Sequence, residues 1–240
     1  MNYYSAEAFV LRKEPSDEKD AIYHFFTREF GRLNLFTKGT RNILAKLAGH
    51  LEIPSLVEIN FSLTHQPRLI SAIEKNPYSE IKNNEKALMV VLELVNLIEQ
   101  LTYFSQRDDE VFNLLFEVFY FMENNLKKFP KVIDFCGFYF KGRFLAILGY
   151  APFLAGCLEC GNKNEAKFFD FSKKGLVCPR HRQKIFIPID PQKKKILFFL
   201  FNAPLKSFSN FRKINEVLKE EKFLDGFLNR FTLTVKSDII

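Results

Sequence analysis

The segment AIYHFFTREFGRLNLFTKG, residues 21–39, carries the main structural signal in the first third of this chain. It contains two runs rich in β-branched and aromatic residues, and Gly31 separates them. Short runs of this composition that end at turn-forming residues are typical of β-strands. Gly39 closes the second run and opens a segment with several basic residues. The stretch therefore predicts two neighbouring strands followed by a basic loop.

Three similar runs flank this pair, at residues 6–12, 50–63 and 69–75. Turn-forming residues separate them, at Pro15-Ser16-Asp17 and Gln66-Pro67. Five consecutive strands in about 75 residues predict a small barrel at the N-terminus. An SH3-like barrel and an OB-fold both fit, because the order of strands in a sheet cannot be read from their sequence.

The pattern changes to helical spacing after Asn76-Pro77, where Leu88, Val91, Leu92, Val95 and Ile98 mark one amphipathic helix. Asp108 or Asp109 can cap a second helix, and Pro130 precedes a third helix that ends at Gly149. Asp190 with Pro191 at the first turn indicates a fourth helix. Apolar runs near 208–219 and 223–235 indicate two more. We expect an α+β chain with four segments: a barrel over residues 1–78, a helical domain over 79–150, an insert over 151–188, and the end of the helical domain over 189–240.

The insert contains two pairs of metal-binding residues. Cys157-x2-Cys160 is followed, after 17 intervening residues, by Cys178-x2-His181. Zinc prefers four thiolate or imidazole ligands in a tetrahedron, and two short knuckles joined by a hairpin provide them. The segment between the pairs, AKFFDFSKKGLV, reads as such a hairpin with its turn at Lys173-Lys174-Gly175. The spacing predicts a Zn²⁺ site.

Two other interpretations of the cysteines stay open. A redox CxxC needs a helix that starts at the motif, and it does not require CPRH further along the chain. The four ligands could also stand at these spacings by accident. Because four protein ligands leave no position for water, a zinc ion here is expected to be structural. Cys136, in a Phe-rich helix, reads as a core residue.

The composition favours a polyanionic partner inside a reducing compartment. Thirty-five Lys and Arg against 28 Asp and Glu give a net charge of +7. The first residues lack the pattern of a signal peptide, and the most apolar helix, residues 88–101, is too short and polar to span a bilayer. We therefore expect a cytoplasmic protein with no membrane association.

No catalytic motif is found. The segments GCLECGNK and GFYFKGR lack the GK[ST] ending of a phosphate-binding loop, and the chain has no HExxH, GxSxG or Rossmann pattern. His24, His50 and His65 have no nucleophile nearby in the sequence and read as surface or satisfied histidines. The chain is expected not to be an enzyme.

Three segments resemble the RecO family of bacterial recombinational repair proteins: AFVLRKEPSDEKDAIYHFFTREFGRLNLFTKGTRN, LAGHLEIPSLVEINF and RFLAILGYAPFLAGCLECG. The resemblance covers the whole chain in order, and the run from Arg143 to Gly161 is its most specific part. It implies that the barrel is an OB-fold. Many family members with a zinc site use four cysteines, whereas His181 takes the fourth position here; other members lack the cysteines, which implies that zinc supports the fold alone.

The resemblance also implies a function in the nucleoid. Similar proteins bind single- and double-stranded DNA, anneal complementary strands, and act with RecR to help RecA replace single-strand binding protein on single strands. RecF belongs to the same pathway. A groove among the helices of residues 85–148 would receive the acidic, apolar C-terminal tail of single-strand binding protein, with Lys127, Lys128, Lys131, Lys141 and Arg143 as nearby positive charges.

The basic loop after the third strand is the predicted nucleic-acid site. It offers Lys38, Arg41 and Lys46, with glycines on both sides, and it matches the basic segment of the family. Arg32 and Arg12 are weaker candidates. Tyr3 and Phe36 are candidate stacking platforms, although rings in so Phe-rich a barrel are more often core. The alternative function is a zinc-stabilised scaffold that joins protein partners without binding DNA directly.

Overall fold

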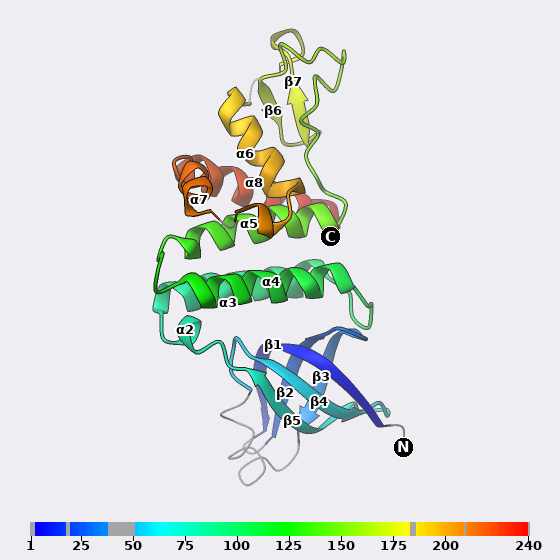
Figure 1. Ribbon diagram of the computed structural model, residues 1–240. Helices are drawn as coiled ribbons and strands as arrows, with labels where there is room; N and C mark the ends of the chain where they lie inside the picture. Colours follow the sequence, from blue (N-terminus) through cyan, green and yellow to red (C-terminus); the bar gives the residue numbers. More distant parts are fainter. Residues whose placement is uncertain (1–2, 18–19, 38–50, 183–185, 209, 240) are drawn as a thin grey trace. The chain divides into compact units, whose positions relative to one another are not determined.

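The chain consists of two compact units, Met1–Ile133 and Asp134–Ile240, shown in Figure 1. The computed structural model describes residues 3–17, 20–37, 51–182, 186–208 and 210–239. The first unit holds the barrel and a helical hairpin, and the second unit holds the remaining helices with the cysteine-containing insert.

Five strands close into a barrel in the order β1-β2-β3-β5-β4. Neighbouring strands are antiparallel except for β3 and β5, which meet in parallel where Phe36 lies opposite Arg68. The closed five-stranded barrel confirms the predicted OB-fold. Its strands are β1 (Tyr3–Asp17), β2 (Asp20–Thr27), β3 (Gly31–Thr37), β4 (Leu56–Ser62) and β5 (Arg68–Asn76).

The turn predicted at Pro15-Ser16-Asp17 is wrong, because β1 continues to Asp17 and Pro15 pairs with Ala21. Proline has no N–H and is tolerated in a sheet where the ladder is irregular. The register between β1 and β2 shifts between Pro15 and Asp17, so the irregularity that proline needs is present.

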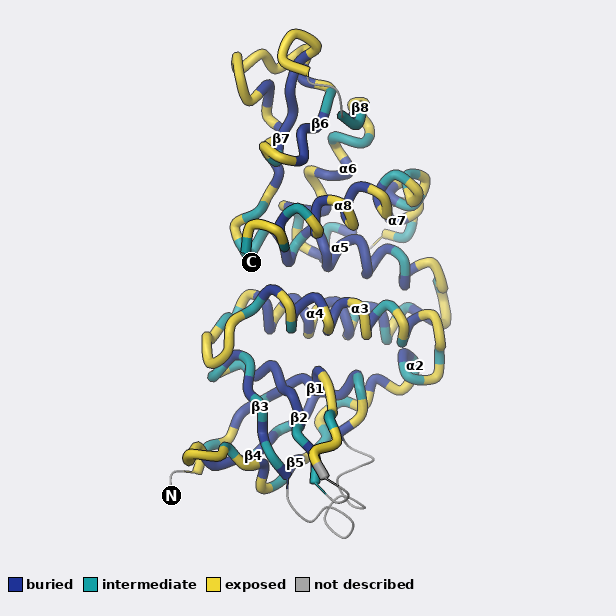
Figure 2. Tube along the Cα trace, turned by 180° about the vertical axis from the view of Figure 1, so that it is seen from behind, coloured by how far each residue is buried: buried dark blue, intermediate teal, exposed yellow. Residues whose placement is uncertain are grey.

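The middle of strand β1, residues 8–11, is buried on both of its faces within the first unit. Ala8 and Val10 lie in the barrel core, whereas Phe9 points outward and its ring centroid lies 5.1 Å from that of Phe112 and 5.6 Å from that of Phe119. Both partners are on α4 (Asp109–Asn125), which runs beside α3 (Glu85–Leu101) after the short helix α2 (Ser79–Lys82). Figure 2 shows buried and exposed positions alternating along α3 and α4, as amphipathic helices require.

Asparagine and aspartate begin these two helices. The Asn84 side chain accepts a hydrogen bond from Ala87 N, and the Asp108 side chain accepts one from Val111 N. Such caps satisfy backbone N–H groups that the helix leaves unpaired. The structure thus selects Asp108 from the two predicted caps.

The second unit packs its helices on α5 (Val132–Ile147). Helix α6 (Pro191–Asn202) crosses α5 at Gly142, where an added Cβ would lie 2.9 Å from Leu200 O. Tyr139 OH donates to Ala203 O at 3.0 Å, and Arg143 Nη1 donates to Phe201 O at 2.6 Å. The unit is completed by the 3-10 turn η2 (Leu205–Phe208), α7 (Phe211–Leu218) and α8 (Glu221–Ile239).

The insert forms a small three-stranded sheet of order β7-β6-β8. Phe169, at its centre, is buried against α8, with ring centroids 4.8 Å from Phe227 and 5.9 Å from Phe231. The predicted hairpin is confirmed, because β6 and β7 pair in antiparallel fashion. The strands are β6 (Phe168–Asp170), β7 (Gly175–Val177) and β8 (Ile187–Pro188), and the 3-10 turn η1 (Pro179–His181) follows β7.

Candidate metal centre and nucleic-acid surface

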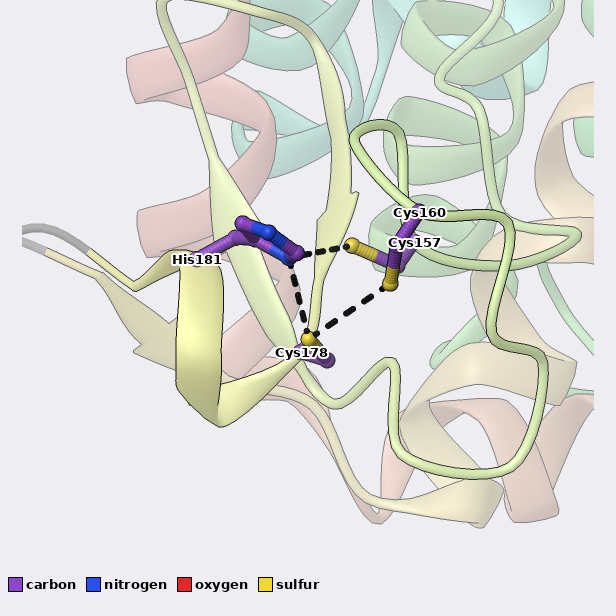
Figure 3. Close-up of side chains that lie close together, drawn as sticks. All are labelled: Cys157, Cys160, Cys178 and His181. Atoms are coloured by element: carbon purple, nitrogen blue, oxygen red, sulfur yellow. Dashed lines mark hydrogen bonds between the residues drawn. The ribbon is translucent and has the colours of Figure 1, made fainter.

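The four predicted metal ligands lie together in the second unit, as Figure 3 shows. Cys157 and Cys160 belong to the loop after α5, Cys178 follows β7, and His181 ends η1. Their Sγ and imidazole nitrogen atoms all lie within 4.8 Å of one another. The sequence spacing therefore identified a real cluster.

The distances fit a tetrahedral zinc ion. Metal–sulfur bonds of about 2.3 Å and metal–nitrogen bonds of about 2.0 Å place neighbouring ligand atoms roughly 3.5–3.8 Å apart. Cys160 Sγ lies 3.9 Å from Cys178 Sγ, and His181 Nδ1 lies 3.6 Å from Cys157 Sγ and 3.3 Å from Cys178 Sγ. The donor set can hold a metal ion of this size and geometry.

Backbone bonds hold the first knuckle. Cys157 N donates to Asn162 O at 2.9 Å, and Gly161 N donates to Cys157 O at 2.8 Å. Gly161 has a φ of 72°, which glycine adopts readily. Leu158 N also donates to Leu176 O at 2.9 Å and so ties the knuckle to β7. Local hydrogen bonding thus brings the two ligand pairs together.

The surroundings favour the thiolate form, which a metal requires, at Cys157 and Cys178, whereas the pKa of the Cys160 thiol is raised beside these two cysteines. Burial opposes ionisation of Cys157, but hydrogen bonds from the backbone at Cys160, Cys178 and Glu159 outweigh it and lower the pKa of this thiol to about 6. Burial also acts against ionisation of Cys178, whereas a hydrogen bond with His181 and backbone bonds lower its pKa overall. Four protein ligands complete a tetrahedron, so a bound ion would brace the insert and would not hold a reactive water.

Unlike the metal ligands, the residues predicted to bind nucleic acid are not brought together in the described part of the structure. Lys38, Arg41 and Lys46 lie outside the described residues. Arg32, on β3, has its guanidinium 3.9 Å from the Phe104 ring centroid, and its Nη1 donates to Thr102 O at 2.9 Å and to Glu99 O. Burial lowers the pKa of Arg32. These bonds satisfy carbonyls at the end of α3 and join it to the barrel; contact of Arg32 with nucleic acid stays a prediction.

A cluster of charged residues and a histidine around Glu99 was not predicted from the sequence. The buried His24 ring places Nδ1 3.2 Å from Glu99 Oε1 and Nε2 3.4 Å from Glu14 Oε2, and Arg12 Nε lies 3.3 Å from Glu99 Oε2. No local signal in the sequence pairs strands β1 and β2 with a residue on α3. His24 is neither the surface nor the satisfied histidine that was expected, because its buried Nε2 has no hydrogen-bond partner among the described residues. Arg12 is engaged in ion pairs.

Lys141 and Arg143, two of the cations expected near the groove for the tail of single-strand binding protein, form hydrogen bonds inside the second unit. Lys141 is buried, with Nζ 3.1 Å from Asn229 Oδ1, and Arg143 bonds to Phe201 O. Lys127 and Lys128, by contrast, are exposed, and Lys127 Nζ lies 2.7 Å from Glu80 Oε1. Both internal cations serve helix packing.

Family comparisons match both units. Residues 1–75 match the family described as "Recombination protein O N terminal", and residues 84–231 match the one described as "Recombination protein O C terminal". The chain belongs to the RecO family.

Several RecO relatives align over most of their length, and each is called "DNA repair protein RecO". The protein of Thermodesulfovibrio yellowstonii is 26% identical over 180 residues, which cover 74% of this chain and 70% of the relative. Those of Dehalococcoides mccartyi (strain BAV1) and Caldicellulosiruptor saccharolyticus are each 24% identical, covering 90% and 91% of this chain and 85% and 90% of the relatives. Within the described residues of this RecO chain, the helices fall short of the length and apolar character that crossing a membrane requires.

Proposed function

We propose that this RecO protein is a mediator of DNA repair and recombination that binds single- and double-stranded DNA and anneals complementary strands. The closed barrel β1-β2-β3-β5-β4 in a chain of this family carries the proposal. OB-folds bind single strands with a cationic groove and with aromatic rings on which bases stack. The protein would act in the cytoplasm, at the nucleoid, and would not be an enzyme.

Annealing requires that the repulsion between two polyanions be suppressed while their base edges stay free to pair. Cationic side chains do this by releasing condensed counterions, and each single-strand phosphate contact contributes about 0.7 to the log–log salt dependence. The proposed contacts are Lys38, Arg41, Lys46 and Arg32. Phe36 lies next to this loop at the end of β3 and is partly exposed.

Zn²⁺ is the proposed occupant of the Cys3His cluster, where it would supply cross-linking of the two knuckles and no reaction chemistry. Cys157, Cys160, Cys178 and His181 would hold it. Because a bound ion would brace a sheet that packs on α8 through Phe169, it would stabilise the second unit.

The proposed partners follow the family. RecR would join this protein to load RecA onto single strands coated with single-strand binding protein, in a pathway that includes RecF. The acidic, apolar C-terminal tail of single-strand binding protein would bind the helical part. With purified partners, RecA ATP hydrolysis on coated single strands should rise when this chain and RecR are added together and stay low when either is omitted.

DNA binding is tested by fluorescence anisotropy of labelled oligothymidine at two salt concentrations. Changing Lys38, Arg41 and Lys46 together to Glu should weaken binding at least tenfold and reduce the salt slope by about 2 if each residue contacts one phosphate. The matched control changes three exposed lysines elsewhere, Lys86, Lys163 and Lys167, to Glu. Annealing of complementary strands should proceed without ATP.

Equal DNA affinity in the loop variant and the wild type would show the loop assignment to be wrong. The alternative, a zinc-stabilised scaffold for protein partners, predicts no DNA binding at physiological salt together with a stable RecR complex. Size-exclusion chromatography with RecR, run beside the anisotropy titration, separates the two functions.

A further inference from the structure

The positive charge of this protein is concentrated in its second unit. Residues 134–240 carry 19 Lys and Arg and 10 Asp and Glu, a net charge of +9, whereas residues 1–133 carry 16 and 18, a net charge of −2. Clustered positive charge is the electrostatic signature of a surface for a polyanion. The barrel, with its basic loop, therefore does not account for the charge surplus of the chain.

Helix α6 displays large apolar side chains to solvent. Its segment ILFFLF, residues 196–201, is apolar all round, a pattern typical of a fully buried helix. Ile196, Leu197, Leu200 and Phe201 are indeed buried, but Phe198 is 54% exposed and Phe199 is 37% exposed. Adjacent exposed rings on a monomer are informative, because apolar area in water is unfavourable and is retained where a ligand covers it.

Each exposed ring has a lysine one helical turn before it. Lys194 precedes Phe198 by four residues and Lys195 precedes Phe199 by four, and side chains at this spacing are neighbours on a helix surface. Lys195 Nζ lies 5.8 Å from the centroid of the Phe199 ring. Lys194 and Lys195 form no ion pair with any residue in the described part of the chain. Helix α6 thus presents two rows, each with one cation and one ring.

Two cavities flank this helix. The first, about 520 Å³, is lined by Lys194, Lys195 and Phe198 together with Phe153, which is 45% exposed. The second, about 600 Å³, is lined by Lys195 and Phe199 together with residues of α7 and its end, among them Lys213 and Lys219. Glu216 supplies the carboxylate of the second cavity. We define the α6 surface as Phe153, Lys194, Lys195, Phe198, Phe199 and Lys219.

The position of Phe153 is fixed by the metal-binding insert. Phe153 N donates to Lys174 O at 2.9 Å, and Phe153 O accepts from Leu176 N at 3.0 Å. Both partners belong to the β6–β7 hairpin or its turn. The ring therefore stands on a backbone that the insert holds in place, which suits a rigid platform for a ligand.

We propose that the α6 surface is a second binding site for single-stranded nucleic acid. The proposal goes beyond the barrel loop and rests on the proposed function only for the class of ligand. Bases stack on exposed aromatic rings whatever their sequence, and lysines beside the rings neutralise the phosphates between them. An acidic peptide with a single apolar end would fill one cavity and leave the rings of the other in water. Two sites on one chain would let it hold two strands for annealing.

The test uses the full chain and two variants that separate charge from stacking. Binding of labelled oligothymidine of about 20 nucleotides, longer than most single OB-fold sites, is compared with binding of an abasic strand of equal length. Lys194→Glu with Lys195→Glu should weaken binding at least tenfold and lower the salt slope by about 1.4. Phe198→Ser with Phe199→Ser should weaken binding of oligothymidine about tenfold, keep the salt slope, and abolish the preference over the abasic strand.

The control variant, Lys163→Glu with Lys167→Glu, makes the same change of charge on exposed lysines of the insert and should bind nearly as wild type. Equal losses in the control and in the Lys194/Lys195 variant would overturn the proposal, because net charge alone would explain them. It would also be overturned if both α6 variants bound DNA as wild type but lost a labelled Asp-rich peptide with a C-terminal Phe.

Failure of this proposal is distinguishable from failure of the proposed function. If the barrel-loop variant loses DNA binding while both α6 variants keep it, the α6 surface is excluded and the proposed function stands. If the α6 variants lose binding while the loop variant keeps it, the second site is supported and the loop assignment is wrong. A wild-type chain that binds no single strand would overturn both.

Discussion

Gly31 shows how one residue fixes the connection between the barrel and the helices of the first unit. Its φ is 64°, and a Cβ at this position would lie 1.9 Å from Gln106 O. Ser105 N donates to Arg32 O at 3.0 Å, so the backbone of the segment after α3 rests directly on the start of β3. Any side chain at position 31 would therefore meet backbone and not a movable side chain.

Gly31→Ala should destabilise the first unit by about 3 kcal/mol or more, since the left-handed backbone strains alanine and the clash forces the 103–106 segment away. Urea unfolding followed by circular dichroism measures the change. Gly226→Ala is the matched control, because a Cβ there has nothing within 4 Å and the position is inside α8; it should be neutral or raise stability by up to about 1 kcal/mol. Equal effects of the two changes would contradict the role of Gly31.

Helix α6 begins at an aspartate cap, packs on α5 and carries the residues of the proposed second site. Asp190 begins it: the side chain accepts hydrogen bonds from Lys193 N at 2.8 Å and from Lys193 Nζ at 2.7 Å. The bonds with the Lys193 side chain and backbone lower the pKa of Asp190. The same helix crosses α5 at Gly142 and carries the exposed rings.

Asp190→Ala should cost about 1 kcal/mol of stability in the second unit, the usual loss when a helix cap is removed. Asp190→Asn keeps a capping oxygen and should cost less. Because the folded state lowers the pKa of Asp190, its charge stabilises the fold above the unfolded pKa of about 4, and this contribution is lost as pH falls through the folded pKa. The difference between wild type and Asp190→Asn should therefore shrink at acid pH in thermal melts; a constant difference would contradict it.

The whole molecule divides its tasks between two units of opposite net charge. The first contains the OB-fold and is slightly acidic, and the second contains the Cys3His cluster and the cationic surplus. A structural metal contributes its binding free energy to the unit that contains its ligands. Loss of the metal should therefore affect the two units unequally.

Cys178→Ser should remove zinc from the purified protein, measured by atomic emission, and should lower the melting temperature of the second unit. Binding of DNA through the barrel loop should persist, because the ligands lie in the other unit. Cys136→Ala is the matched control: Cys136 is buried in α5, where burial raises the pKa of its thiol, and its loss should leave zinc content unchanged. Equal zinc content in the Cys178 variant and the wild type would contradict the ligand assignment.

Features that depend on near neighbours along the chain could be predicted from the order of the residues. The CxxC and CxxH pairs, the cap at Asp190 and the positive-φ ending at Gly149 each involve residues a few positions apart, so their spacing predicts their structure. A cap before α4 was also indicated, but the structure was needed to choose Asp108 over Asp109. The strands of the barrel were also predicted, because alternation and turn residues are local signals.

Contacts between residues far apart in the chain could not be predicted in this way, because they arise when the elements pack together. Barrel closure pairs β3 with β5 and β1 with β4, the guanidinium of Arg32 reaches carbonyls 67 and 70 residues away, and Phe198 and Phe199 stay exposed although their sequence resembles that of a buried helix. Such contacts depend on how the elements pack, and the residue pattern of one helix or strand does not indicate which other element will pack against it.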